Sequence, residues 1–282
     1  MHSSHNVRFW RDADLPELEI NRVVQSAHAF PRHTHSQYVV GAMEEGASYC
    51  LGSSRTNAVV AAGQLCLINP EQVHTGEPLR DVLTSYRMFY AEQDWVRTLA
   101  TELAGTDTEP EFNAVIHADH ETVHAFLQLS NAIIHGTELL GKQSAMVRAF
   151  SLLLTRRAAI RPAESSLRAT TSTTSAKHEG NRAVRRVHEH LLANLGTNVP
   201  LENLSTATGL SRYHLLRVFK RATGMTPHAY HLQLRIERAK MLLRSGWAPA
   251  EAALETGFAD QSHFANTFRR FVGATPRQYV AR

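Results

Sequence analysis

The chain has 282 residues, 43% hydrophobic and 20% charged, so it is long enough for two domains that each bury a core. It contains no long apolar run, no apolar signal core near its start and only two cysteines, Cys50 and Cys66; this excludes a membrane span and a disulfide framework and favours a cytoplasmic protein. The net charge of +4 is uneven, because residues 181–282 carry 15 Lys+Arg against 6 Asp+Glu, and this excess suggests that the C-terminal part binds nucleic acid.

Residues 20–90 are expected to form many short strands. Glycines and an Asn-Pro pair separate the β-prone runs, and this spacing predicts an antiparallel barrel or sandwich. The runs are Val39–Val40, Ser48–Leu51, Ala58–Val60 and Leu65–Ile68.

Two amphipathic helices are expected after residue 119. An apolar stripe runs from Val123 to Ile134 at helical spacing, and a second helix is predicted from about Leu140 to Arg157. These helices need a partner surface, either the barrel or a second subunit. We expect a homodimer through this region.

Residues 161–181 are poor in apolar groups and rich in Ser and Thr, so they are predicted to be an interdomain linker. From Arg182 to the end of the chain the pattern is helical.

The C-terminal part contains an internal repeat. Residues 209–230 and 257–279 match at six pairs of positions with a shift of 49, five of them identical and one a Leu–Phe pair, which implies two copies of one structural unit. The pairs are His214 and His263, Leu215 and Phe264, Phe219 and Phe268, Gly224 and Gly273, Pro227 and Pro276, and Tyr230 and Tyr279.

Each copy has the pattern of a helix-turn-helix. In the first, Gly209 supplies a tight turn and Ser211 can cap the next helix; in the second, Gly257 and Asp260 occupy the corresponding places. The predicted bounds are about 201–221 and 249–270 for the two units, with a connecting helix at about 228–245. The outward faces of the second helices carry the candidate DNA contacts Arg212, Tyr213, Leu216, Arg217, Lys220, Gln261, Ser262, His263, Asn266 and Arg269.

The segment from about Ala183 to Arg282 resembles the DNA-binding domain of the AraC/XylS family, most specifically in the run ETGFADQSHFANTFRRFVGATPRQY. The resemblance implies seven helices, with two recognition helices that enter successive major-groove segments of an operator. It implies base contacts at Tyr213, Leu216, Arg217, Gln261, Ser262, His263 and Asn266. Leu216 and Asn266 depart from the residue types common in the family, so Leu216 is expected to read a thymine methyl group.

The runs FPRHTHSQYVVGAMEEG and GQLCLINPEQVHTGEP resemble the AraC-type sensor domain, a cupin-like barrel. The expected fold class is therefore α+β with two domains. Residues 1–160 form a cupin-like β-barrel with a helical pair, which binds an effector and dimerises. Residues 182–282 form an all-α domain with two helix-turn-helix units.

Three histidines are the main candidates for the sensor site. His33 and His35 project to the same side of a strand, and His74 is expected to lie near them. Imidazole triplets bind Zn, Ni, Cu or Fe, but Val39 and Val40 stand where the cupin metal motif has a glutamate. Effector contact, metal binding and a structural role stay open, and the missing carboxylate predicts no tightly held metal and no cofactor. Further effector-pocket candidates are Tyr38, Glu77, Tyr86 and Arg87.

These features predict a ligand-responsive, sequence-specific transcription regulator, and the family resemblance favours activation. The expected partners are a double-stranded DNA operator, a small-molecule effector and a second copy of the chain, with RNA polymerase as a further candidate. The alternative is a cupin enzyme that carries a basic domain. The paired helix-turn-helix repeat and the missing metal carboxylate favour the regulator, which is not an enzyme.

Overall fold

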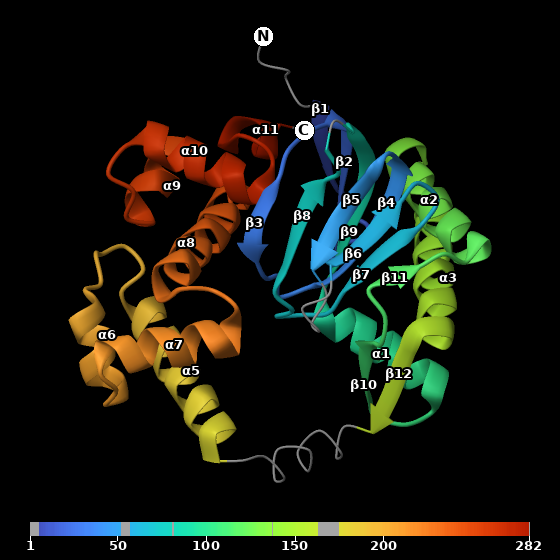
Figure 1. The fold of residues 1–282 in the computed structure, drawn as a ribbon. Coiled ribbons are helices and arrows are strands. Elements are labelled where there is room, and N and C mark those ends of the chain that lie inside the picture. Colours follow the sequence, from blue (N-terminus) through green and yellow to red (C-terminus); the bar gives the residue numbers. More distant parts are fainter. Residues whose placement is uncertain (1–5, 52–56, 81, 137, 163–174, 282) are drawn as a thin grey trace. The chain divides into compact units, whose positions relative to one another are not determined.

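The computed structural model describes residues 6–51, 57–80, 82–136, 138–162 and 175–281 (Figure 1). The chain forms two compact units, one mainly before and one mainly after residues 163–174. Strand β3 (Phe30–His33) is described with the N-terminal unit, because it is hydrogen-bonded to β8 in a sheet of that unit. Among the described residues, no helix combines the length and apolar character needed to cross a membrane.

The N-terminal unit is built on two antiparallel sheets. The larger has the order β1 (Asn6–Arg11), β2 (Leu18–Ser26), β9 (Thr84–Ala91), β4 (Tyr38–Glu45), β7 (Leu65–Ile68) and β11 (Ile116–His117). The smaller has the order β3, β8 (His74–Pro78), β5 (Ala47–Leu51) and β6 (Asn57–Ala61). A separate pair joins β10 (Thr108–Phe112) to β12 (Ala158–Pro162).

The larger sheet buries both of its faces, because successive side chains of a strand point to opposite sides. One face contributes Val40, Leu67 and Phe89 to a core shared with helices. The other contributes Val39 and Cys66 to a second core that includes residues of the smaller sheet and fills the space between the two sheets. We call this second region the barrel interior. Its buried core residues are Val39, Met43, Cys50, Val60, Cys66 and Ile68.

Three helices cover the outer face of the larger sheet: α1 (Gln93–Ala104), α2 (His120–His135) and α3 (Leu139–Arg157). Phe126 lies at the centre of this packing, with its ring 5.1 Å from those of Phe89 and Phe150. Phe126 and Phe150 are fully buried, so the apolar stripe expected for the two later helices is used within the chain. Helix α1 has no counterpart among the elements predicted from the sequence.

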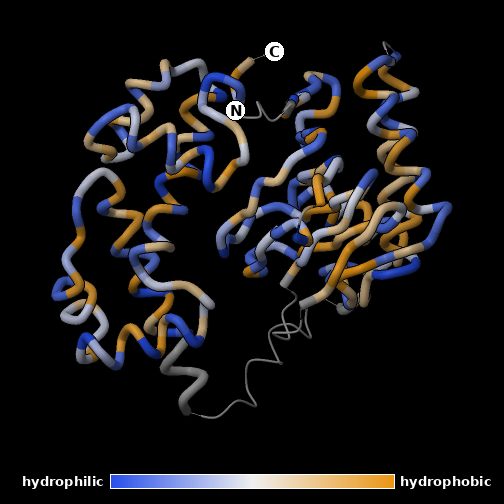
Figure 2. The backbone as a smooth tube through the Cα atoms, turned by 45° about the horizontal axis from the view of Figure 1, so that its top comes forward, coloured by the Kyte–Doolittle hydropathy of each residue, from blue (hydrophilic) through white to orange (hydrophobic). Residues whose placement is uncertain are grey.

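The C-terminal unit is helical. Its elements are α5 (Ser175–Ala193), α6 (Leu201–Thr208), α7 (Arg212–Thr223), α8 (Pro227–Arg244), α9 (Pro249–Glu255), α10 (Gln261–Val272) and α11 (Pro276–Val280). Hydrophobic and hydrophilic residues are interspersed along these helices, as Figure 2 shows. The predicted fold class, a β-rich cupin-like domain followed by a helical domain with two helix-turn-helix units, is confirmed.

The expected linker at 161–181 is shortened at both ends. Strand β12 extends to Pro162, because its pairing with β10 uses backbone groups and needs no apolar side chains, and α5 begins at Ser175. The middle of the expected linker, residues 163–174, lies outside the described residues.

The sequence repeat corresponds to repeated packing. The rings of Phe219 and Tyr230 meet edge to face at 5.5 Å, and those of Phe268 and Tyr279 do so at 5.4 Å. Gly224 and Gly273 end α7 and α10 in the left-handed conformation, which explains why both copies have glycine there. The shared residues of the repeat are therefore the scaffold on which each second helix is held.

Candidate nucleic-acid interface and effector site

Helix α7 begins where the sequence predicts. The Ser211 hydroxyl accepts a hydrogen bond from the backbone N–H of His214 at 3.3 Å, and Gly209 has a φ of 73° in the preceding turn. Leu215 and Phe219 are fully buried on the inner face. The helix therefore presents its opposite face outward.

The outward face of α7 carries the predicted DNA contacts. Tyr213 is 77% exposed, and an aromatic side chain so exposed on a basic helix favours contact with a partner over packing. Arg212 forms an exposed ion pair with Glu202 of α6, so part of its charge is already compensated within the unit. The other exposed candidates are Leu216, Arg217 and Lys220.

Helix α10 has the same construction. The Asp260 carboxylate accepts a hydrogen bond from the His263 N–H at 2.7 Å, and Phe264 and Phe268 are fully buried. The His263 ring is exposed but lies edge-on to Phe258 at 5.3 Å, which restricts its orientation. Gln261, Ser262 and Asn266 are exposed, and Arg269 is half-buried.

The two helix-turn-helix units are tied together by a buried arginine of α8. Arg235 donates to three backbone carbonyls: from Nε to Leu195 at 2.7 Å, from Nη2 to Thr197 at 2.7 Å and from Nη1 to Gly257 at 3.1 Å. The first two carbonyls lie between α5 and α6, and the third lies in the turn between α9 and α10. One side chain therefore holds a loop of each helix-turn-helix unit. We call Arg235 and its three carbonyl partners the Arg235 clamp.

The same two loops also touch through glycines. A Cβ atom placed on Gly257 would lie 2.5 Å from the carbonyl oxygen of Gly196, and Gly257 has a φ of 76°. Only glycine fits this approach without displacing backbone. The sequence indicated the turn at Gly257, but it gave no sign of Arg235, which lies among the basic residues of an apparently ordinary helix.

In the N-terminal unit the three predicted histidines lie together. One ring nitrogen of each of His33, His35 and His74 lies within 4.8 Å of the others. The rings of His35 and His74 are 4.9 Å apart, and Tyr90 lies edge-on to His35 at 5.3 Å. Burial lowers the pKa of His33 to about 4, which keeps this ring neutral at neutral pH.

The other predicted effector residues do not all join this cluster. Tyr86 packs against the barrel interior, on the same face of β9 as Tyr90. Tyr38 lies on the opposite face of the larger sheet, where its hydroxyl donates to the Pro110 carbonyl and burial raises its pKa to about 12. Arg87 also lies on that face, and Glu77 is exposed on β8.

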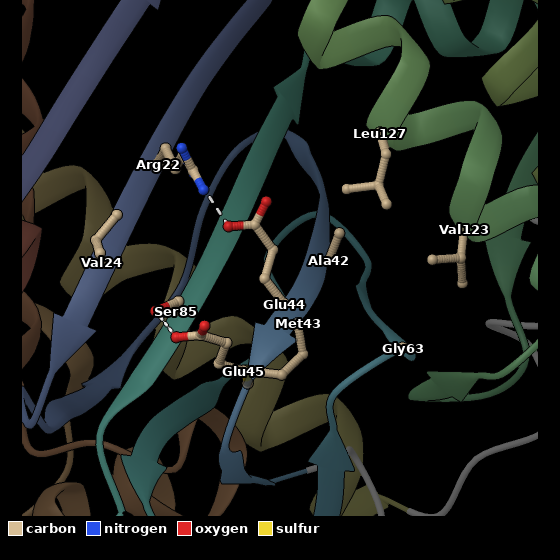
Figure 3. A pocket seen from close by; sticks show the side chains of 10 residues that line it. All are labelled: Arg22, Val24, Ala42, Met43, Glu44, Glu45, Gly63, Ser85, Val123 and Leu127. Atoms are coloured by element: carbon tan, nitrogen blue, oxygen red, sulfur yellow. Dashed lines mark hydrogen bonds and ion pairs between the residues drawn. The ribbon is translucent and has the colours of Figure 1, made fainter.

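A cavity of about 350 Å³ opens between the larger sheet and α2 (Figure 3). Glu44 is central to its polar part: it accepts from Arg22 at 3.0 Å and from Arg87 at 2.6 Å. Val123 and Leu127 of α2 form an apolar side of the cavity. No sequence pattern indicates this cavity, because its walls come from separate strands and a helix.

The two cysteines are neighbours in the barrel interior. The sulfur atoms of Cys66 and Cys50 are 3.2 Å apart, and both residues are buried. The Cys66 thiol donates to Cys50, which raises the pKa of Cys66 and lowers that of Cys50. Both are free thiols.

Both halves of the chain match known protein families. Residues 16–153 match the model of an AraC-like ligand binding domain, and residues 204–282 match that of a helix-turn-helix domain. The chain is 32% identical to the HTH-type transcriptional regulator YbfI of Bacillus subtilis over 87% of this chain and 85% of that protein. It is 26% identical to the HTH-type transcriptional activator RhaS of Escherichia fergusonii over 97% of this chain and 95% of that protein. A crystal structure of ToxT from Vibrio cholerae shares the fold with a TM-score of 0.54 at 12% identity, covering 98% of this chain and 97% of that one.

Proposed function

Because this chain belongs to the AraC family of transcription regulators, we propose that it is a ligand-responsive activator that reads an operator with α7 and α10. The observation that carries this proposal is the pair of capped helices with matching buried faces and exposed polar faces, in a unit of high positive charge. Residues 182–282 supply DNA binding and residues 1–160 supply effector binding and dimerisation. RNA polymerase is the further partner that activation requires.

Two substitutions on α7, one at Arg217 and one at Lys220, test whether this helix reads bases. Arg217→Ala should weaken operator binding by about 1–3 kcal/mol and relax the preference at one base pair, because a guanidinium can form two hydrogen bonds to a guanine. Lys220→Ala should weaken binding to operator and to scrambled DNA about equally, because a lysine here contacts phosphate. It should also reduce the steepness of the plot of log binding constant against log salt concentration by about 1. Titrations of both variants on an operator selected from random duplexes, at several salt concentrations, measure these effects.

The matched pair makes the outcome decisive. Arg217 and Lys220 are both exposed cations on one helix, so a general loss of positive charge would affect both variants alike. Equal losses on operator and scrambled DNA for Arg217→Ala would mean that Arg217 contacts the backbone, and the assigned reading face would then be wrong.

We infer that the effector binds in the barrel interior beside His35 and His74, with Tyr86 as a further contact. Imidazole and phenol side chains can orient a small polar ligand through hydrogen bonds. A thermal-shift screen of the full chain against metabolites tests this, since a ligand at a hundredfold excess over Kd stabilises by about 2.7 kcal/mol. The cavity beside Glu44 is the competing location, and Arg22→Ala tests it because Arg22 lines that cavity.

We expect dimerisation to use the outer face of α3. Leu140 is 76% exposed and Val147 is 46% exposed, two turns apart on this helix. Changing both to Asp should convert a dimer at micromolar concentration into a monomer, as measured by sedimentation. Leu254→Asp is the control, because Leu254 is 78% exposed but belongs to the C-terminal unit. A monomeric wild-type protein, or a double variant that still dimerises, would refute this interface.

The enzyme alternative has a distinct signature. A cupin enzyme would turn over a substrate and would not bind DNA in a sequence-dependent way. The family relatives are transcriptional regulators, which supports a non-enzymatic role.

A further inference from the structure

We propose that His33, His35 and His74 form a binding site for one divalent transition-metal ion of the zinc type. The first observation is convergence: three imidazoles from the end of β3, the following loop and the start of β8 bring one ring nitrogen each within 4.8 Å of the others. All three residues are buried. This metal binding goes beyond the proposed DNA-binding function, and it adds an ion to His35 and His74, beside which we propose that the effector binds.

The second observation concerns the protonation of the rings. Nδ1 of His33 lies 2.7 Å from the Pro31 carbonyl, and Nδ1 of His74 lies 2.9 Å from the Gln72 carbonyl. A carbonyl oxygen only accepts hydrogen bonds, so Nδ1 carries the proton in both rings. Nε2 is then the nitrogen that bears the lone pair in each case, which is the tautomer that a metal ion requires.

These carbonyl contacts also orient the rings. Metal-binding histidines almost always donate their other ring N–H to a carbonyl, a carboxylate or water, and this contact holds the ring in place. His33 and His74 each have such a contact to the residue two positions earlier in the chain. The two rings are thus held by their own local backbone, independently of any ion.

The donor set fits zinc. Nitrogen atoms bound to Zn²⁺ at about 2.05 Å in a tetrahedron are roughly 3.3 Å apart, so the cluster needs only small side-chain rotations to close on an ion. Three histidines with a fourth position for water or a ligand form a known zinc arrangement. Val39 and Val40, both fully buried, stand where the cupin metal motif has a glutamate, and from that absence alone we expected no tightly held metal. The convergence of three imidazoles supports the opposite inference, because imidazole triplets bind such ions.

Metal analysis of the full chain tests the proposal. The protein is stripped with EDTA, loaded with Zn²⁺ or Co²⁺ and desalted. We expect about one Zn²⁺ per chain, a higher melting temperature than the stripped protein, and the ligand-field absorption of tetrahedral Co²⁺. His74→Gln and His35→Gln should each weaken Zn²⁺ binding by more than about 100-fold, since losing a ligand costs more than the roughly 10–100-fold caused by losing the hydrogen-bond partner of a ligand.

The matched control is the double variant His120→Gln, His124→Gln. These rings stack 6.3 Å apart on the exposed face of α2 and form the obvious competing surface site. The control should keep the full metal content and the cobalt spectrum. Substoichiometric metal in the wild type, or loss of metal in the α2 control alone, would overturn the proposal. Circular dichroism of the stripped proteins verifies folding, and if His74→Gln misfolds, His35→Gln and His33→Gln decide the result.

Discussion

Replacing Arg235 with Met should cost the C-terminal unit about 3–4 kcal/mol of stability and abolish DNA binding by both recognition helices. The guanidinium satisfies three backbone carbonyls, and each buried acceptor left without a donor costs roughly 1–3 kcal/mol. The cost stays below the sum because the buried guanidinium no longer has to be desolvated. Methionine keeps the apolar stem and removes both the donors and the positive charge.

Lysine at the same position separates charge from geometry. Arg235→Lys keeps the positive charge, but an ammonium group on a flexible stem cannot reproduce the planar fork that reaches Leu195, Thr197 and Gly257 together. We expect it to recover less than half of the lost stability. Hydrogen exchange of the full chain, followed in helices α5 to α10, measures the loss of stability in the C-terminal unit. If the amides of α9 and α10 are as protected from exchange in Arg235→Met as in the wild type, the Arg235 clamp is refuted.

Gly257→Ala is expected to cost about 3 kcal/mol or more, against about 1 kcal/mol for Gly209→Ala. Both glycines have positive φ, near 75°, in the turn of a helix-turn-helix, so both variants carry the usual left-handed penalty of roughly 1–2 kcal/mol. Only Gly257 faces another backbone, since an added Cβ would lie 2.5 Å from the Gly196 carbonyl oxygen, whereas nothing lies within 4 Å at Gly209. The difference in destabilisation between the two variants therefore measures the Gly196–Gly257 contact between the two helix-turn-helix units.

Chemical denaturation of the two glycine variants measures this difference, with hydrogen exchange assigning the loss to the C-terminal unit. The DNA affinity of Gly257→Ala should fall further than that of Gly209→Ala, because displacing Gly196 also shifts the loop that leads into α6. Equal destabilisation by the two substitutions would show that the Gly196–Gly257 approach relaxes without cost.

The sequence repeat and the helix-capping residues made it possible to predict the helices of the C-terminal unit from its sequence. Ser211 and Asp260 cap α7 and α10 as predicted, because capping is a local interaction that leaves a local sequence pattern. The N-terminal elements were less visible. Helix α1 and the β10–β12 pair depend on packing against distant segments, and the paired residues of Thr108–Phe112 and Ala158–Pro162 are 46 to 54 positions apart in the chain.

The Arg235 clamp shows the limit of such reasoning. An arginine on an amphipathic helix is ordinarily a solvent-exposed residue, and its three partners are backbone carbonyls that leave no mark on composition. The effector candidates show a second limit. His35 and Tyr38 are close in sequence, but a loop separates β3 from β4, so the alternation of strand side chains could not be carried from one to the other.

The edge-to-face ring pairs Phe219–Tyr230 and Phe268–Tyr279 have a consequence for protein engineering. Because equivalent buried residues hold both recognition helices, their outward positions correspond at a constant offset of 49, so that Arg217 corresponds to Asn266 and Tyr213 to Ser262. Transplanting the outward residues of one helix onto the other leaves the supporting rings untouched. We expect such a transplant to transfer base preference from one operator segment to the other while the scaffold stays constant.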